Sequence, residues 1–194
     1  GLGDVYKRQD VNRIPNLACF QRFVPAVRAL WKLDLSDEER WNRVASLLPL
    51  LLDDPELRAQ AATWELTRGA DGKYTNLLFY EDPDYGFVIN GLVKGPSGVT
   101  PVHDHAHTWT AYSVIYGSED VVRLRLDHDA PAGQIARISE TEQYTVKPGF
   151  VDVVPPRSVL QVLFLRDLQV FERRMNVIHA FHAPLQVDRA LADG

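Results

Sequence analysis

The stretch PVHDHAHTWTAYSVIYG (residues 101–117) holds three histidines and then continues as a β-rich segment. The chain of 194 residues has six histidines, so half of them lie in this one place. In a strand, alternate side chains lie on one face about 6.6–7 Å apart, so His103 and His105 project together while Asp104 points away. Two converging imidazoles can hold one metal ion if other strands supply further ligands. The stretch therefore predicts a β-sheet protein with His103 and His105 as metal ligands.

A third histidine in the same stretch, His107, would share the face of His103 if the strand continued. It would then lie about 13 Å from His103, which is too far for both rings to bind one ion. We therefore expect His107 to line the cavity, or to bind the ion only after a bend in the chain.

The chain after residue 72 is built from short β-rich runs that are separated by turn residues. The cluster DPDYG (residues 82–86) is one such turn signal. Many short strands at a spacing of roughly 8–12 residues favour an antiparallel sandwich or barrel. We expect strands within residues 73–94, 108–117, 119–127, 135–140, 143–147, 150–155, 159–165 and 175–182.

The first third of the sequence has helical periodicity instead. Residues 16–33 place apolar side chains at three-to-four spacing. Ser36 and Glu39 have the spacing of a capping box, and Asp54 followed by Pro55 is a further helix start. We expect these helices to pack as a cover on the sheet, without a chemical role.

The sequence thus divides into a helical N-terminal region at residues 10–69 and a barrel at residues 70–194, with the helices packed on the barrel. Residues 1–9, GLGDVYKRQ, resemble a translated sequencing adapter, so we expect a non-native segment there and exclude it from the fold. A natural start to the protein is the alternative for these nine residues.

The composition is that of an ordinary globular protein, with 45% hydrophobic and 24% charged residues. A net charge of −5 gives no electrostatic reason to expect nucleic acid or an anionic membrane as a partner. The single cysteine, Cys19, excludes an internal disulfide and suits a reducing cytoplasm. No apolar run approaches the roughly 20 residues of a membrane span. We therefore expect a cytoplasmic protein without nucleic-acid or membrane partners.

Glycine and proline stand at regular places around the histidines. Gly98 precedes the pair, Gly117 follows its strand, and PGFVDVVPPRSVLQV (residues 148–162) carries a glycine and then a proline six positions on. These two segments resemble the signature motifs of the cupin family. The resemblance implies a mainly β fold, the cupin double-stranded β-helix (jelly-roll barrel), behind the N-terminal α-helical region. Within the cupins, residues 73–109 are similar to cysteine dioxygenase and related thiol dioxygenases.

The resemblance to thiol dioxygenases implies an Fe(II) enzyme that oxidises a small thiol to a sulfinate with dioxygen. Those proteins hold the iron with three histidines, and they lack the glutamate that many cupins add after the first motif; here Trp109 or Thr110 stands in its place. Neutral imidazoles leave the site positive, which lowers the pKa of the thiol and favours the thiolate. Open positions on the iron then bring the two reactants together.

The third histidine of the family falls on Leu160 in this sequence. Leucine contributes roughly 1.5–3 kcal/mol by burial, but it cannot bind iron. Three explanations fit: a single-base error in the sequence, a loss of the metal with the barrel retained, or another histidine in place of this one. His179 is the best substitute because it lies on another predicted strand, ahead of His182 and His128.

His179 also matches the histidine of a serine–histidine–tyrosine set that thiol dioxygenases carry on a late strand. Val177 and Phe181 stand where the serine and the tyrosine would be, so a hydrogen-bonded network of that type is incomplete. The resemblance implies a catalytic role for His179 beside the metal, and a histidine packed in the core is the alternative.

Asn76 replaces the arginine with which the family binds a substrate carboxylate. Asparagine can hydrogen-bond, but it cannot form a bidentate charged pair with a carboxylate. This departure argues against cysteine or 3-mercaptopropionate as the substrate. The residues that we expect to contact the substrate are Tyr74, Asn76, Trp109 and Tyr112.

Two hypotheses for the function follow, and residue 160 discriminates between them. The first is an Fe(II)-dependent thiol dioxygenase-like cupin. The second is a metal-free or weakly metal-binding cupin that acts as a small-molecule-binding or structural barrel. Arg123 and Arg125 alternate on one predicted strand and would offer charge to a substrate, although an exposed basic stripe is the simpler expectation.

Overall fold

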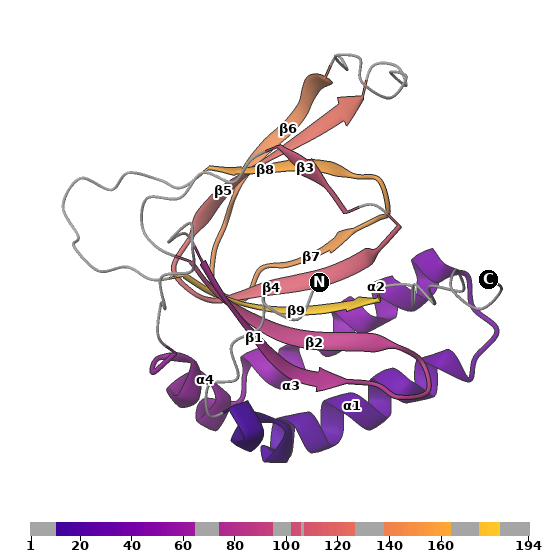
Figure 1. Cartoon of the computed structure of the whole chain (residues 1–194), viewed down its shortest axis with the longest axis vertical. Helices are drawn as coiled ribbons and strands as arrows, with labels where there is room; N and C mark the ends of the chain where they lie inside the picture. The colour runs from indigo at the N-terminus through magenta and orange to yellow at the C-terminus, as the bar shows by residue number, and fades with distance from the viewer. Residues whose placement is uncertain are drawn as a thin grey trace, which may run out of the picture.

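In a computed structural model, the described part of the chain comprises residues 11–64, 74–94, 102–105, 107–126, 138–163 and 175–182. A layer of helices covers one face of a five-stranded sheet, and a four-stranded sheet lies over the other face (Figure 1). The strand orders are β1-β2-β9-β4-β7 and β3-β8-β5-β6. The strands are β1 (Tyr74–Glu81), β2 (Phe87–Lys94), β3 (His103–Asp104), β4 (Trp109–Tyr116), β5 (Glu119–Leu126), β6 (Ile138–Val146), β7 (Val151–Val154), β8 (Val159–Leu163) and β9 (Met175–His182).

Strands β2 to β9 pair as one long antiparallel hairpin that is rolled up. The first of these strands pairs with the last, β2 with β9, and the further pairs are β3 with β8, β4 with β7 and β5 with β6. Within β2 to β9, successive strands lie in opposite sheets except for β5 and β6. This is the strand order of an eight-stranded jelly roll. It confirms the predicted fold class, a mainly β double-stranded β-helix of the cupin type with helices at its N-terminal side.

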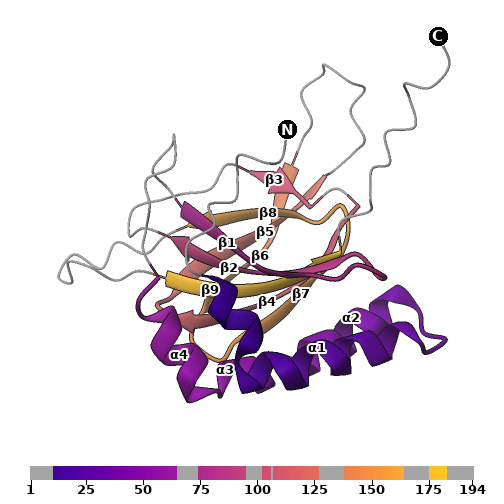
Figure 2. The same cartoon turned by 60° about the horizontal axis from the view of Figure 1, so that its bottom comes forward.

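The helical layer begins with a short 3-10 helix and continues with four α-helices. They lie together along the five-stranded sheet (Figure 2). None of the helices in the described ranges is long and apolar enough to cross a membrane. The bounds are η2 (Val11–Asn16), α1 (Ala18–Trp31), α2 (Asp37–Leu47), α3 (Pro49–Leu52) and α4 (Pro55–Ala61).

Two predicted helix starts are confirmed by their capping bonds. At α2, the Ser36 hydroxyl accepts from the Glu39 N–H at 3.2 Å, and the Glu39 carboxylate accepts from the Ser36 N–H at 3.2 Å. At α4, the Asp54 carboxylate accepts from the N–H groups of Glu56 and Leu57 at 3.1 Å and 2.9 Å. These bonds satisfy backbone donors that have no partner inside the helix.

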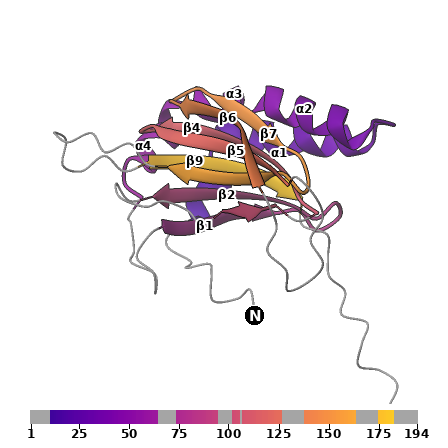
Figure 3. The same ribbon diagram turned by 90° about the horizontal axis from the view of Figure 1, so that it is seen from above.

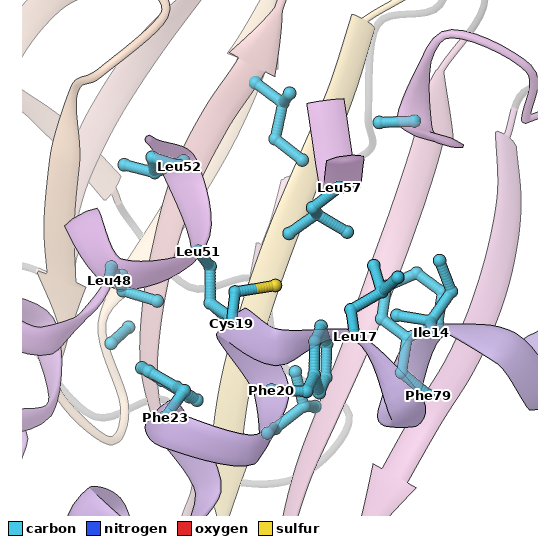
Figure 4. Close-up of a cluster of buried hydrophobic side chains, with 14 of the residues drawn as sticks. Ile14, Leu17, Cys19, Phe20, Phe23, Leu48, Leu51, Leu52, Leu57 and Phe79 are labelled. Carbon is cyan, nitrogen blue, oxygen red and sulfur yellow. The ribbon is translucent and has the colours of Figure 1, made fainter. Parts of the chain in front are cut away.

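The main hydrophobic core lies between the helices and the outer face of the five-stranded sheet (Figure 4). Phe20 packs edge-on against Phe79 of β1, with 6.0 Å between the ring centroids. Burial, and then the charge of Asp54, raises the pKa of the Cys19 thiol in this core to about 11. A Cβ atom at position 91 of β2 would lie 2.5 Å from the Phe79 ring. This ring therefore packs against the backbone of β2 only because residue 91 is glycine.

A second, smaller apolar cluster lies on the inner face, between the two sheets. It contains Tyr112, Val114, Val121, Val146 and Val154. The residues of β4 divide between the two clusters by alternation, since Ala111 and Ile115 belong to the helix-side core. The five-stranded sheet is therefore buried on both faces, and its inner face carries the residues that surround the candidate site.

The two strands expected at residues 135–140 and 143–147 are a single strand within the described range, β6, which pairs with β5 over its length. The pairing shifts by one residue between Arg123 and Leu124 of β5, where β6 carries an additional residue, Thr141. The prediction of a break in this region was therefore wrong.

The turn between β1 and β2 is fixed by Asp82, whose side chain is fully buried. Its carboxylate accepts from the N–H groups of Asp84 at 3.0 Å and Tyr85 at 2.9 Å. It also accepts from the Tyr80 hydroxyl at 2.9 Å and from Arg28 Nη1 of α1 at 2.5 Å. Burial by itself would raise the pKa of Asp82, but these hydrogen bonds outweigh it and hold the pKa below its usual value. The same bonds tie the helical layer to the sheet.

We expect Asp82→Asn to lower the free energy of unfolding near neutral pH by about 1–3 kcal/mol, because it removes a charged acceptor from a buried turn. The contribution of the carboxylate is fully present above its unfolded pKa of about 3.9 and is lost as the pH falls through the lowered native pKa. Denaturant unfolding from about pH 7 down to about pH 3 should therefore show a steeper acid loss of stability in the parent than in Asp82→Asn. Parallel acid losses in the two proteins would contradict this assignment.

Candidate functional site

The two histidines of the β3 segment do project together. Their rings are stacked, with 5.6 Å between the centroids and 28° between the ring planes. His103 is exposed and His105 is half-buried. The geometry brings two imidazoles to one place at the edge of the four-stranded sheet, where β3 lies. Their role as metal ligands remains a prediction.

Thr110 of β4 holds one of these rings in place. The distance between His105 Nδ1 and Thr110 Oγ1 is 3.0 Å. Thr110 is buried and shares the inner face of β4 with Tyr112, two positions on. When Nδ1–H donates to the threonine oxygen, Nε2 keeps the lone pair with which a neutral histidine binds a metal. The contact therefore suits a ligand histidine, and it anchors His105 to the inner face of the opposite sheet.

Position 160 lies directly opposite the first histidine. In the pairing of β3 with β8, His103 is in register with Leu160, and Asp104 is in register with Val159. Residues opposite each other on antiparallel strands share a face, with Cβ atoms about 4.5–5.5 Å apart. The position that the family resemblance assigns to the third ligand is therefore next to His103, and leucine occupies it.

His103 and His105 are the predicted metal ligands whose side chains the structure describes. Among them, no group of three His, Cys, Asp or Glu side chains is placed to hold a metal ion. Two imidazoles fit part of an Fe(II) site, but the described donor set does not fit the three-histidine site that the resemblance implies. The side chains of His179 and Leu160 lie outside the described part, and so does His128.

Four residues on neighbouring strands of the five-stranded sheet form a row across its inner face, because each is in register with the next. In the register of β2, β9, β4 and β7, Asn90 lies opposite His179, His179 opposite Tyr112, and Tyr112 opposite Asp152. The strand β9 runs between β2 and β4 (Figure 3). The row belongs to the inner face, because Tyr112 belongs to the inner cluster. His179 therefore stands in the middle of a polar row.

Arg123 of β5 connects the four-stranded sheet to this row. Its Nη2 lies 2.7 Å and 2.6 Å from the two carboxylate oxygens of Asp152, and its Nε donates to the Tyr144 hydroxyl at 3.1 Å. The Tyr144 hydroxyl in turn donates to Asp152 at 2.8 Å. Arg123 is also in register with Leu160. The row His103–Leu160–Arg123 therefore faces the row that ends at Asp152.

The expected exposed basic stripe was wrong for Arg123, whose side chain is 24% exposed and ion-paired, whereas Arg125 is exposed. The reason is strand alternation, which turns residue 123 to the inner face with Val121. Burial by itself lowers the pKa of Arg123, but the charge of Asp152 outweighs it, and the net pKa is raised. The Arg123 guanidinium therefore carries its positive charge at neutral pH.

The two tyrosines near this ion pair stay protonated. Burial raises the pKa of Tyr112 well above its usual value, and the neighbouring Tyr144 and Asp152 add to the effect. Burial, together with the hydrogen bond to Asp152, raises the pKa of Tyr144 to about 12. Both phenols therefore act as neutral hydrogen-bonding groups on the inner face.

The fold places the predicted substrate-contacting residues on different faces of the five-stranded sheet. Tyr112 lies on the inner face, and so does Asn76, which pairs with inner-face Leu92 and accepts a hydrogen bond from Asn90. Trp109 packs against the helix-side core, so the prediction that it contacts the substrate is not supported. Its alternation with Tyr112 along β4 turns it outward. Tyr74 begins β1, and its side chain lies outside the described part.

The position of His107 also differs from the expectation. The Thr108 N–H donates to the His105 carbonyl at 2.8 Å, which turns the chain between β3 and β4. His107 lies on this turn and is exposed, so it does not line the inner face. His182 is in register with Phe87, which belongs to the helix-side core, so its row is not the inner row of His179.

Three residues of the inner face, Asn90, Tyr144 and Asp152, were missed in the sequence. One signal was available for Asp152, since it stands alone between valines in a β-rich run, where an acidic side chain on a buried face needs a partner. Asn90 offered a weaker form of the same signal, since it is the one polar side chain in the run FVINGLV (residues 87–93).

A scan against models of protein families finds no match, and no curated protein matches the chain. Among solved structures, the cupin domain of Cnp3 from Schizosaccharomyces pombe is 8% identical, with a TM-score of 0.42 over 63% of this chain and 70% of that chain. An oxalate oxidase is 13% identical, with a TM-score of 0.43 over 62% of this chain and 56% of that chain. Hydroquinone 1,2-dioxygenase PnpCD, in a complex with Cd2+ and 4-hydroxybenzonitrile, is 18% identical, with a TM-score of 0.43 over 66% of this chain and 71% of that chain. The fold assignment rests on the strand pairing described above.

We expect the Arg123–Asp152 contact to be energetically coupled. Arg123→Met and Asp152→Asn should each lower the free energy of unfolding by about 1–3 kcal/mol, because each leaves a partly buried charge without its partner. The double variant should lose less than the sum of the two, by about 0.5–3 kcal/mol in a double-mutant cycle from denaturant unfolding. Arg125→Met is the control and should change stability by about 0.5 kcal/mol or less. A strictly additive cycle would contradict the contact.

Proposed function

We propose that this chain is a metal-dependent cupin that binds Fe(II) and oxidises a small thiol with dioxygen, as its resemblance to thiol dioxygenases implies. The observation that supports the proposal most is the pair of stacked imidazoles of His103 and His105, 5.6 Å apart. The 3.0 Å contact of His105 with Thr110 adds to it, because it suits a histidine whose other nitrogen binds a metal.

In the proposed reaction, R–SH and O2 give R–SO2H, so both oxygen atoms end on the sulfur and no further reductant is needed. His103 and His105 would hold the iron, which would supply open positions for the thiol and dioxygen. His103 and His105 would provide neutral donors, which favour the thiolate form of the substrate. The phenol of Tyr112 would remain protonated near the reactants, whereas the Tyr144 hydroxyl already donates its proton to Asp152.

The proposal gives His179 a role as a hydrogen-bonding group next to the reacting atoms. Its place in the register supports this role, because it stands between Asn90 and Tyr112 on the inner row. Asp152 at the end of this row contacts Arg123, and Arg123 is in register with Leu160, which lies opposite His103. The row therefore faces the strand that carries His103. A small thiol held near the two imidazoles would therefore lie within the part of the barrel that these residues surround.

The register of Leu160 favours a second candidate function. Because Leu160 is opposite His103, the third donor is missing from the strand that would bring it closest. A barrel of this kind with a polar inner row and without a strongly bound metal would act as a small-molecule-binding protein. The two candidates differ in whether the histidine pair binds iron at useful affinity.

Anaerobic loading with Fe(II), followed by desalting and measurement of bound iron, tests the proposal. The variants are His105→Ala, which removes one proposed ligand, and Leu160→His, which adds an imidazole opposite His103. His107→Ala is the matched control, since it removes an exposed histidine from the adjoining turn. Incubation of each protein with cysteamine and O2, followed by mass spectrometry for the sulfinate, reports activity.

We expect the parent to retain iron that His105→Ala loses and that His107→Ala keeps. Leu160→His should bind iron more tightly than the parent and form more sulfinate, because three imidazoles hold the ion instead of two. Iron in the parent that does not depend on His105 would refute the ligand assignment. Negligible iron in the parent, with stoichiometric iron in Leu160→His, would decide for the metal-free binding protein.

A further inference from the structure

Asn90 carries a buried acceptor that has no partner. The residue is 2% exposed. Its Nδ2 donates a hydrogen bond to the side-chain oxygen of Asn76, whereas its own Oδ1 has no hydrogen-bond partner among the residues that the structure describes. A buried polar atom without a partner is costly, so most such atoms in native proteins have one. The orphaned oxygen therefore points to a partner that the described residues do not provide.

The place of Asn90 in the fold indicates where the missing hydrogen-bond donor would lie. Its neighbours Ile89 and Gly91 face the helix layer, since Ile89 lies in the helix-side core and Gly91 lies against Phe79. Strand alternation turns Asn90 to the inner face with Leu92, which packs on the inner cluster. The acceptor therefore lies on the face that looks into the barrel, on the row of His179 and Tyr112.

The charges described on the inner face are balanced in pairs. Lys94 Nζ lies 2.7 Å from the Glu119 carboxylate, and both side chains are buried. Arg123 is paired with Asp152 at 2.6 Å. Each of these cations is thus committed to an acid of the chain. A ligand carboxylate would meet paired cations and an acceptor oxygen, which disfavours it.

We propose that Asn90 Oδ1 accepts a hydrogen bond from the ligand of this barrel, and that the ligand is a small molecule with an amino or hydroxyl group and without a carboxylate. The inference deepens the proposed function by naming the ligand class, and it needs only that the barrel bind a small molecule. Asn76 is a positioning residue, because its side-chain oxygen holds the Asn90 amide so that Oδ1 faces inward. A site built around a buried acceptor rejects analogues that lack the matching donor.

Isothermal titration calorimetry on the metal-free protein, residues 1–194, under argon tests this inference. The probes are cysteamine, which has an amine, 1-propanethiol, which lacks a donor at that place, and 3-mercaptopropionate, which has a carboxylate. Asn90→Leu removes the acceptor at similar size, and Asn90→Asp keeps it and adds a negative charge. Leu92→Met is the matched control, because it changes an apolar residue on the same face of the same strand.

We expect the parent to bind cysteamine about tenfold or more tightly than either other thiol, since only the cysteamine ammonium can donate a charge-assisted hydrogen bond to the Asn90 oxygen. Asn90→Leu should abolish this preference, Asn90→Asp should increase it, and Leu92→Met should leave it unchanged. If Asn90→Leu does not fold, the preference of the parent for cysteamine and the increase of that preference in Asn90→Asp still decide whether Asn90 accepts a hydrogen bond from the ligand.

Three outcomes would overturn the inference: equal binding of the three thiols by the parent, a preference that survives in Asn90→Leu, or no binding of any probe. The experiment uses metal-free protein, so its result is independent of the iron measurement. A protein that retains no iron and still prefers cysteamine would refute metal binding and uphold the role of Asn90. A protein that retains iron but binds the three thiols equally would uphold metal binding and refute the role of Asn90.

Discussion

The pairing of β3 with β8 sets residue 160 directly opposite His103, and the pairing of β8 with β5 sets the same residue beside Arg123. Register in an antiparallel sheet fixes the face of every side chain, because a slip of one residue would turn the whole strand over. The rolled hairpin then brings this row to face the one that runs from Asn90 to Asp152. The chemistry of the candidate site depends on these two rows being at the same level.

The helical layer makes this arrangement possible by burying the opposite face of the same sheet. The aromatic and aliphatic residues of α1 to α4 fill the outer side, and Gly91 lets the Phe79 ring approach the backbone of β2. Because the outer face supplies most of the apolar burial, the inner face can carry polar groups. Several of these groups hydrogen-bond to one another. The ion pair of Arg123 with Asp152 is the clearest case, since it joins strands of the two sheets.

The fold was predictable because its signals are local. Turn residues and short β-rich runs favoured a barrel, and the capping residues Ser36 and Asp54 marked two helices that the structure has. The convergence of His103 with His105 followed from strand alternation. The partners of Arg123 and the orphaned oxygen of Asn90 were not predictable, because each depends on residues far away in the sequence that only the strand register brings together. Trp109 was misplaced for a related reason, since an aromatic residue in a strand gives no sign of which buried face it takes.

Two-dimensional and three-dimensional nuclear Overhauser spectra of the isotope-labelled protein test the register most directly. The account predicts cross-strand contacts between the backbone protons of His103 and Leu160, and between those of Leu160 and Arg123. Contacts of His103 with Val159 or Gln161 in place of Leu160 would contradict it, because residue 160 would then face away from the two imidazoles.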